Sequence, residues 1–390
     1  MSSLGNFLVE DIVFLEPQPV IPITPRRISG VNWLALVSGL GFISYSGSAI
    51  PESYDRHLMS LTLLADWLRE GEWARLSSSD VSTSISNCCL MILGDSIRAG
   101  HDGSCETLAN CVQAKQARHL TFKLEAEGVA AMASFDAWLA SLPLGGFNQN
   151  LLAKNLHEDV LACIGYTEKV NEVGHMESGS GGGLCVHLLP GPHDAVSCLM
   201  PQQPIHAATL PKSVDRVGSG KSGLRGVTNP HLCRVAGRRV LATSGQNSQQ
   251  LAMYTDLADD LDRMEASLHW GHLAPTCPDS LLGYPLSDCD PLLMRFPPAD
   301  SSIAFNSIDY PDIYVSATGQ SEVKQPVWRR ANLFPHLTAT KQGRGTSEVV
   351  TAEGALLVSV PRFDMSHCIA LVDLDSLDCH IVHFDVDSTC

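Results

Sequence analysis

Side chains that could take part in catalysis follow four short apolar runs of the sequence, at the point where each run ends. Two of the runs end in Gly94-Asp95-Ser96 and in Gly191-Pro192-His193-Asp194, which supply two carboxylates and an imidazole. The other two end in Ser38-Gly39-Leu40-Gly41 and Ser244-Gly245-Gln246-Asn247. Because sites in open α/β sheets form at the carboxyl ends of strands, we expect the four loops to lie together. Carboxylates and imidazoles are metal ligands, so these loops are the place where the sequence could supply ligands to a metal ion.

A phosphate-binding loop is the second candidate, suggested by Gly218-Ser219-Gly220-Lys221-Ser222. The full pattern needs a glycine five residues before Gly220, and Asp215 occupies that position. It also needs a strand before the loop and a helix after it, so that backbone N–H groups converge on the phosphate. Pro211 precedes the segment and Pro230 follows it. We therefore interpret this segment as a flexible loop and predict no nucleotide site.

Metal ligands outside the strand-end loops are poorly arranged. The 13 cysteines include no Cys-x-x-Cys pair, so a zinc finger or zinc ribbon would lack its first two ligands. Free buried thiols in a reducing compartment are the simpler interpretation. His380 and His383 are three residues apart in a predicted strand and therefore point to opposite faces. We predict no metal and no cofactor for this chain.

Composition and charge exclude several classes of protein. The 390 residues include 26 basic and 42 acidic side chains, and the formal net charge is −16. Affinity for DNA comes mainly from cations that displace counterions, so we predict contact with DNA only through a partner. No apolar run reaches the roughly 18 residues of a membrane-spanning helix, and no basic segment typical of a secretory signal opens the chain. A hydrophobic content of 44% is typical of a folded protein, and we expect it to be intracellular.

Short apolar runs recur along the chain and predict the strands of a sheet. They are four to seven residues long and apolar on both faces, which is typical of central strands. The runs are Trp33–Val37, Cys88–Leu93, Leu184–Leu189, Arg239–Thr243, Asp312–Ser316, Ala355–Val360, Cys368–Leu374 and Cys379–Phe384. The last three follow one another closely, so part of the sheet is expected to be antiparallel.

Helical patterns lie between several of these runs. Leucines from Leu58 to Leu68 form one stripe, and a second stripe from Leu251 to Leu268 begins after Asn247 or Ser248 as a candidate N-cap. The Ala-rich segment 107–142 predicts one or two helices with an interruption near Gly128. Together the patterns predict an α/β fold, a layered domain with mixed β-sheets flanked by helices.

The domain organisation follows from where these elements begin and end. We predict one main domain over residues 31–388, with loop insertions near 155–183, 212–226 and 325–348. The third insertion contains Trp328-Arg329-Arg330 and Lys341-Gln342-Gly343-Arg344, which form a small basic loop. Residues 1–30 are Pro-rich after one possible strand and are too few to make a domain.

The order and spacing of the strand-end loops resemble the calcineurin-like metallophosphoesterase fold. That fold holds two metal ions that clamp a phosphate and activate water. Compared position by position, only Asp95, His193 and Asp194 remain as vestigial ligands. The other ligand positions correspond to Ser38, Leu40, Arg98, Pro192, Ser244 and the histidine-free segment 316–320. The resemblance therefore implies a catalytically degenerate domain with no catalytic residue.

Several motifs resemble, more specifically, the B subunits of replicative DNA polymerases, and among them the small subunits of polymerase delta. These motifs are Leu199-Met200-Pro201-Gln202-Gln203-Pro204-Ile205-His206, Val227-Thr228-Asn229-Pro230, Leu241-Ala242-Thr243-Ser244-Gly245-Gln246-Asn247 and His272-Leu273-Ala274-Pro275-Thr276-Cys277-Pro278-Asp279-Ser280-Leu281. The residues expected to maintain the turns of this family are Gly39, Gly41, Gly94, Gly191, Pro201, Gln202, Gly245, Gln246, Asn247, Pro275, Pro278 and Asp279. The resemblance extends from about Trp33 to Phe384.

This resemblance implies a non-catalytic accessory subunit of the polymerase delta holoenzyme that acts in DNA replication in the nucleus. Its expected partners are the C-terminal domain of the catalytic chain and a third polymerase subunit. Members of the family carry an OB-fold upstream, and residues 1–30 are similar only to its tail, so they are interpreted as an OB-fold remnant. The first alternative is an active metal-dependent phosphoesterase or nuclease of the same fold. The second is a binding module unrelated to replication.

Overall fold

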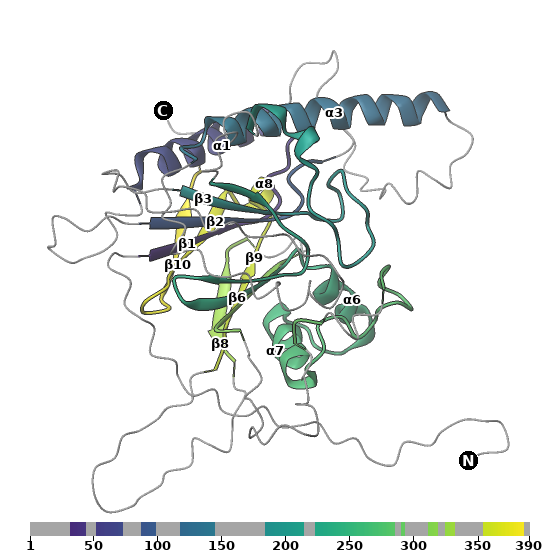
Figure 1. The fold of residues 1–390 in the computed structure, drawn as a ribbon, viewed down its shortest axis with the longest axis vertical. Coiled ribbons are helices and arrows are strands. Elements are labelled where there is room, and N and C mark those ends of the chain that lie inside the picture. The colour runs from purple at the N-terminus through teal and green to yellow at the C-terminus, as the bar shows by residue number, and fades with distance from the viewer. Residues whose placement is uncertain are drawn as a thin grey trace, which may run out of the picture.

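The computed structural model describes residues 32–43, 52–72, 87–98, 118–144, 184–213, 223–284, 290–292, 311–318, 324–331 and 354–385 (Figure 1). The predicted OB-fold remnant at residues 1–30 and the predicted insertion at 155–183 lie outside these described residues. The predicted insertion at 212–226 lies partly outside them, because residues 214–222 are not described.

Six strands form the first sheet, in the order β11-β10-β1-β2-β3-β4. Their bounds are β1 Asn32–Val37, β2 Asn87–Leu93, β3 Leu184–Leu189, β4 Leu224–Gly226, β10 Cys368–Asp373 and β11 Cys379–His383. Strands β1 to β4 are parallel, whereas β10 and β11 pair antiparallel. The parallel strands therefore end at one edge, where the first three strand-end loops meet.

Five strands form the second sheet, in the order β5-β6-β7-β9-β8. Their bounds are β5 His231–Val235, β6 Arg238–Thr243, β7 Ile313–Ala317, β8 Val327–Arg330 and β9 Leu356–Val360. The central strands β6, β7 and β9 are parallel, and the two edge strands pair antiparallel to them. Mixed sheets were predicted, and the pairing in both sheets confirms that prediction.

The two sheets pack face to face between two layers of helices (Figure 1). Alternate residues of β1 separate these layers: Leu34 and Leu36 point into the core between the sheets, while Trp33, Ala35 and Val37 point toward the helices. Helices α1 (Glu52–Glu70) and α3 (Arg118–Ser141) cover the first sheet with apolar side chains such as Leu64 and Phe135. Helices α6 (Gln246–Tyr254) and α7 (Asp260–Trp270) lie beside the second sheet, where Met264 and Leu268 of α7 contact Tyr314 and Leu357. The order of layers is therefore helix, sheet, sheet, helix.

All eight predicted strands are present within one or two residues of their predicted bounds. The prediction missed three further strands. Strand β4 has only three residues, buried and partly exposed residues alternate in β5, and β8 carries two arginines, so none of them is a continuous apolar run. The predicted basic loop is wrong where the structure describes it, since Trp328-Arg329-Arg330 belong to edge strand β8. Arg329 binds the carboxylates of Asp262 (2.6 Å) and Glu265 (2.5 Å) on α7, so its charge is compensated within the fold. Residues 332–348 of the predicted insertion lie outside the described residues.

Two helix predictions are also wrong in detail. Helix α3 runs through Gly128 without interruption, because a single glycine weakens a helix without ending it. The stripe from Leu251 to Leu268 is two helices, separated at residues 255–259, and Asp259 caps the second by accepting a hydrogen bond from Leu261 N. Among the helices of the described residues, none is long and apolar enough to cross a membrane.

The N-cap of α6 is Gly245, and the prediction of Asn247 or Ser248 as the cap is wrong. Asn247 is buried in the first turn, where its Nδ2 donates to the Leu273 carbonyl oxygen (3.1 Å) and to Tyr314 Oη (3.1 Å). Gly245 has φ +88°, a left-handed conformation that side chains disfavour. A Cβ atom at this position would lie 1.9 Å from the carbonyl oxygen of Ala317. The close approach of the two strand ends therefore requires glycine.

We predict that Gly245→Ala lowers the free energy of unfolding by about 2–4 kcal/mol, because backbone strain and a clash with backbone combine there. Gly237 is the matched control, since its φ is +83° and a Cβ there would contact nothing within 4 Å. Gly237→Ala should cost only the conformational strain, about 1–2 kcal/mol. Urea denaturation of the two variants measures both values. Equal losses in the two variants would contradict the role of the Ala317 contact.

Candidate functional site

The loops that follow β1, β2 and β3 lie against one another at the carboxyl edge of the first sheet. Gly39 N donates to the Gly94 carbonyl oxygen (3.0 Å), and Phe42 N donates to that of Ser96 (3.0 Å). A Cβ on Gly191 would lie 2.3 Å from the backbone nitrogen of Asp95. The structure therefore brings together the loops that the strand-end argument predicted to meet, and glycine permits their closest approach.

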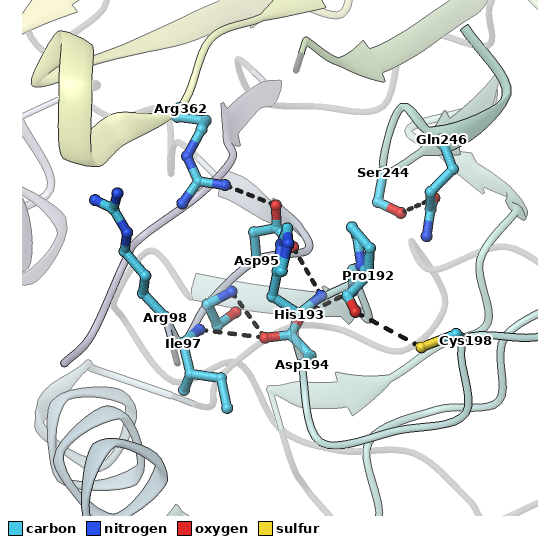
Figure 2. Close-up of polar contacts among 12 residues, drawn as sticks. Asp95, Ile97, Arg98, Pro192, His193, Asp194, Cys198, Ser244, Gln246 and Arg362 are labelled. Carbon is cyan, nitrogen blue, oxygen red and sulfur yellow. Dashed lines mark hydrogen bonds and ion pairs between the residues drawn. The ribbon is translucent and has the colours of Figure 1, made fainter. Parts of the chain in front are cut away.

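Asp95 lies at the centre of this site and is in contact with two basic side chains (Figure 2). Its Oδ1 accepts a hydrogen bond from the backbone N of His193 (3.2 Å) and pairs with the Nδ1 of the same residue (2.9 Å). Its Oδ2 accepts a hydrogen bond from Nη1 of Arg362 (2.7 Å). The backbone of Asp95 has φ +54°, which aspartate tolerates better than most residues. Both carboxylate oxygens are therefore occupied by groups of the protein itself.

Arg362 is the functional residue that the sequence argument missed. It lies two residues after the end of β9 and immediately before the short helix α8 (Phe363–Ser366). Its backbone forms a parallel β-bridge with Ser38. Besides Asp95, it binds Asp364 through two hydrogen bonds, from Nε to Oδ1 (3.0 Å) and from Nη2 to Oδ2 (2.9 Å). Such a two-point contact fixes the guanidinium in position. The rule that sites form at strand ends, applied to Pro361-Arg362 after the predicted strand Ala355–Val360, would have identified it.

Asp194 binds the backbone of the loop after β2. Its side chain is buried, and Oδ1 accepts hydrogen bonds from the backbone nitrogens of Ser96 (2.9 Å) and Ile97 (3.2 Å). Its Oδ2 accepts one from Gly191 N (2.8 Å). Asp194 therefore organises the loops, and its oxygens face backbone N–H groups.

The three titratable groups have shifted pKa values with distinct causes. Burial acts to raise the pKa of Asp95, but the hydrogen bond from His193 and the charges of His193 and Arg362 outweigh it and lower the pKa overall. The hydrogen bond to Asp95 raises the pKa of His193 against the opposing effect of burial. Burial, assisted by the charge of Asp95, raises the pKa of Asp194 to about 7. The two carboxyl groups are thus shifted in opposite directions: the basic neighbours favour the ionised form of Asp95, and burial disfavours that of Asp194.

Neutral amides and a hydroxyl fill the side of the site toward the second sheet. Asn229 Nδ2 donates to Oε1 of Gln202 (2.7 Å) and of Gln246 (2.8 Å), and it also contacts Ser244 Oγ. Gln246 Nε2 donates to Gln202 Oε1 (2.9 Å), and Ser244 Oγ donates to Gln246 Oε1 (2.6 Å). Gln202 Nε2 in turn donates to the Gly191 carbonyl oxygen (3.1 Å). This network connects the loops after β3 and β6 without using a charged group.

The remaining residues of interest occupy different places. Arg98 reaches toward Asp364, with Nη1 3.7 Å from Oδ2, and its side chain is 39% exposed. Pro192 accepts a contact from the thiol of Cys198 and offers no side-chain ligand (Figure 2). Pro201 follows Met200, whose backbone pairs with Gly283. Pro275, Pro278 and Asp279 lie in the turns after α7.

Arg362 and His193 neutralise the charge of Asp95, and few side chains at this edge remain that could bind a metal ion. A divalent ion at this edge would bind Asp95 and His193, and it would have to displace the Arg362 guanidinium to reach the carboxylate. Ser38 and Ser244 add hydroxyls, while Leu40 and Pro192 add no donor. A pair of divalent ions needs many more oxygen and nitrogen ligands than these side chains supply.

Comparison with known proteins gives a consistent result. The family of B subunits of DNA polymerases alpha and epsilon matches residues 148–304, which include β3 to α7. The chain is therefore similar to this family of polymerase B subunits over that region. It is 28% identical over 386 residues to DNA polymerase delta subunit 2 of Drosophila melanogaster, a match that covers 99% of this chain and 66% of the fly protein.

Two further relatives bear the name DNA polymerase delta small subunit. The Arabidopsis thaliana protein is 38% identical over 128 residues, which is 33% of this chain and 28% of the relative. The Saccharomyces cerevisiae protein is 28% identical over 229 residues, which is 52% of this chain and 40% of the relative. The chain thus spans just under two thirds of the fly protein and smaller parts of the other two.

We predict that Arg362→Ala lowers the free energy of unfolding by about 2–4 kcal/mol, because Asp95 and Asp364 then lose the cation that compensates them. Arg98→Ala is the matched control: Arg98 is also near Asp364, but it is more exposed, and its loss should cost about 0–1 kcal/mol. Chemical denaturation near neutral pH measures both. If Arg98→Ala lowered the free energy of unfolding as much as Arg362→Ala, the conclusion that Arg362 is the cation compensating Asp95 and Asp364 would be contradicted.

A pH dependence of stability follows from the raised pKa of His193. A group whose pKa is higher in the folded state stabilises the fold fully below its unfolded pKa, about 6.5 for histidine, and loses this contribution as pH rises through the folded pKa. The stability difference between the wild type and His193→Gln should therefore be larger near about pH 6 than near about pH 8. His383→Gln, at an exposed position of β11, is the control. A difference that grows with pH would exclude the Asp95–His193 ion pair.

Proposed function

We propose that this chain is a non-catalytic accessory subunit of the DNA polymerase delta holoenzyme and acts in DNA replication. The match of residues 148–304 to the B-subunit family and the likeness to three proteins named as polymerase delta subunits support this function. The four-layer arrangement of helices and mixed sheets, with ligand-like residues at the strand ends, supports a domain of the calcineurin-like phosphoesterase fold that has lost catalysis.

One observation carries the non-catalytic part of the proposal. The guanidinium of Arg362 lies on Asp95, the residue that would begin a metal site. The charge that a metal ion would supply is thus already present on the protein, and two further hydrogen bonds to Asp364 hold it there. A group fixed in this way neither activates water nor leaves the site during a reaction.

The partners that fit this function are the C-terminal domain of the catalytic chain and a third polymerase subunit. Association with them would place the chain in the nucleus, with DNA contacted only through the complex. The net charge of −16 supports an indirect role at DNA and favours encounter with a basic partner. Residues 1–30 are proposed to correspond to the end of the OB-fold that members of the family carry.

We predict that co-expression with the C-terminal segment of a polymerase delta catalytic chain yields a stable one-to-one complex in size-exclusion chromatography with light scattering. The corresponding segment of a polymerase alpha catalytic chain is the control for specificity. Stable complexes of proteins bury roughly 800 Å² per partner, so the free chain should expose apolar surface and aggregate more readily. A soluble monomer that binds neither segment would contradict the proposal.

The alternative function, a metal-dependent phosphoesterase or nuclease, makes the opposite prediction for activity. With excess Mn²⁺, we expect no hydrolysis of a chromogenic phosphodiester or of DNA ends, because Arg362 and the lost ligands prevent metal binding at Asp95. Asp95→Ala should therefore leave the background rate unchanged. Manganese-dependent turnover that disappears in Asp95→Ala would establish the alternative instead.

A further inference from the structure

Five buried cysteine and histidine side chains gather between the two sheets, away from the strand-end loops. Cys89 on β2 is the register partner of Cys185 on β3, and His187 follows two residues later on the same face. His231 and Cys233 of β5 face them from the second sheet, again two residues apart. The potential ligand atoms of Cys89, Cys185 and His187 lie within 4.8 Å of one another, as do those of His187, His231 and Cys233.

The two ring nitrogens of His187 are in different situations. Nδ1 is 3.2 Å from Nε2 of His231, which is a hydrogen bond between the two imidazoles. Nε2 is buried and has no hydrogen-bond partner among the residues that the structure describes. The side chain of His187 is only 2% exposed, so this nitrogen cannot turn to solvent. A buried imidazole nitrogen without a partner is costly unless it has a ligand.

The thiol of Cys185 interacts with those of Cys89 and Cys233. Contact with Cys89 lowers the pKa of the Cys185 thiol despite burial, and His187 and Arg225 lower it further. The same contact, together with burial, raises the pKa of Cys89. Cys233 interacts electrostatically with Cys185 and with Arg225. Two thiols and an imidazole whose ligand atoms lie this close together are a setting in which a soft divalent ion can replace the thiol protons.

We propose that Cys89, Cys185, Cys233 and His187 bind one zinc-class ion, with His231 as the hydrogen-bond partner that orients His187. Three thiolates and one imidazole are a known ligand set of structural zinc sites, in which Zn–S is about 2.3 Å and Zn–N is about 2.0 Å. The ion would bind Nε2 of His187, and Nδ1 would keep its contact with His231, as ligating histidines commonly do. The thiol protons leave to solvent when the ion binds.

Arg225 supports the charge balance of such a site. Three thiolates and a divalent ion carry a net charge of −1, and burial of an uncompensated charge is unfavourable. Arg225 on β4 is the register partner of His187, and its charge acts on both Cys185 and Cys233. The ion would connect β2 and β3 of the first sheet to β5 of the second. The sequence contains no Cys-x-x-Cys pair because the ligands come from three strands instead of one turn.

Cobalt provides a direct test on the full chain, purified under reducing conditions and freed of metal with a chelator. Titration with Co²⁺ should produce thiolate-to-cobalt charge-transfer bands and the intense d–d bands of a tetrahedral site, saturating at one ion per chain. Zn²⁺ should then displace the cobalt and abolish these bands. Elemental analysis of the chain as isolated should find zinc in the same ratio.

Matched variants locate the site. Cys185→Ser should abolish the cobalt bands, whereas Cys88→Ser should keep them, because Cys88 is equally buried but points into the core under the helices. His231→Phe should keep the bands and weaken Co²⁺ binding about 10- to 100-fold, the usual effect of losing an outer hydrogen-bond partner. Circular dichroism checks that each variant is folded. A folded wild type that holds no zinc and gives no cobalt bands overturns the proposal, and so do equal bands in Cys185→Ser and Cys88→Ser.

Discussion

The contact between the Arg362 guanidinium and the Asp95 carboxylate is the interaction on which the strand-end region depends. It joins residues 267 positions apart in the sequence, one after β2 of the first sheet and one after β9 of the second. Asp95 and Asp364 both contact the guanidinium of Arg362, and without it the repulsion between their carboxylates would separate the loops that carry them. A fixed cation between Asp95 and Asp364 removes most of this repulsion and connects the two sheets.

This contact requires glycine at two neighbouring positions of the loop after β1. A Cβ on Gly39 would lie 2.9 Å from side-chain carbons of Arg362, and one on Gly41 would lie 2.7 Å from Cβ of Asp364. Both glycines have positive φ, so the loop after β1 turns tightly enough to admit the segment that carries Arg362 and Asp364. The loop after β1 therefore leaves room for this segment beside Asp95. Ser38 still takes part, but through its backbone carbonyl oxygen, which accepts a hydrogen bond from the N–H of Phe363 (2.7 Å).

The sequence predicts the strands of this fold well and the contacts between distant segments poorly. Runs such as Leu184–Leu189 are buried on both faces, so local composition is enough to identify them. The pairing of Arg362 with Asp95 is not local, and charge at a strand end has no periodicity that would reveal its partner. Strand β8 was missed for a related reason: Trp328-Arg329-Arg330 resembles a basic loop until Asp262 and Glu265 of α7 are seen to compensate Arg329. The break between α6 and α7 falls at residues 255–259, where apolar spacing continues although the backbone is extended at Thr255.

The polar groups inside this fold are compensated in two ways, and the difference bears on what an accessory subunit requires. At the strand ends, Arg362 and the network of Gln202, Asn229, Ser244 and Gln246 satisfy one another, so no external ion is needed to hold the loops. Between the sheets, His187 keeps one nitrogen that no described residue pairs with, beside thiols, and this is where we propose the zinc-class ion. A subunit proposed to hold a complex together must keep its shape through many cycles of synthesis. A covalently attached guanidinium serves that requirement, because the cation cannot dissociate, and the proposed buried ion would serve it at a point from which exchange with solvent is slow.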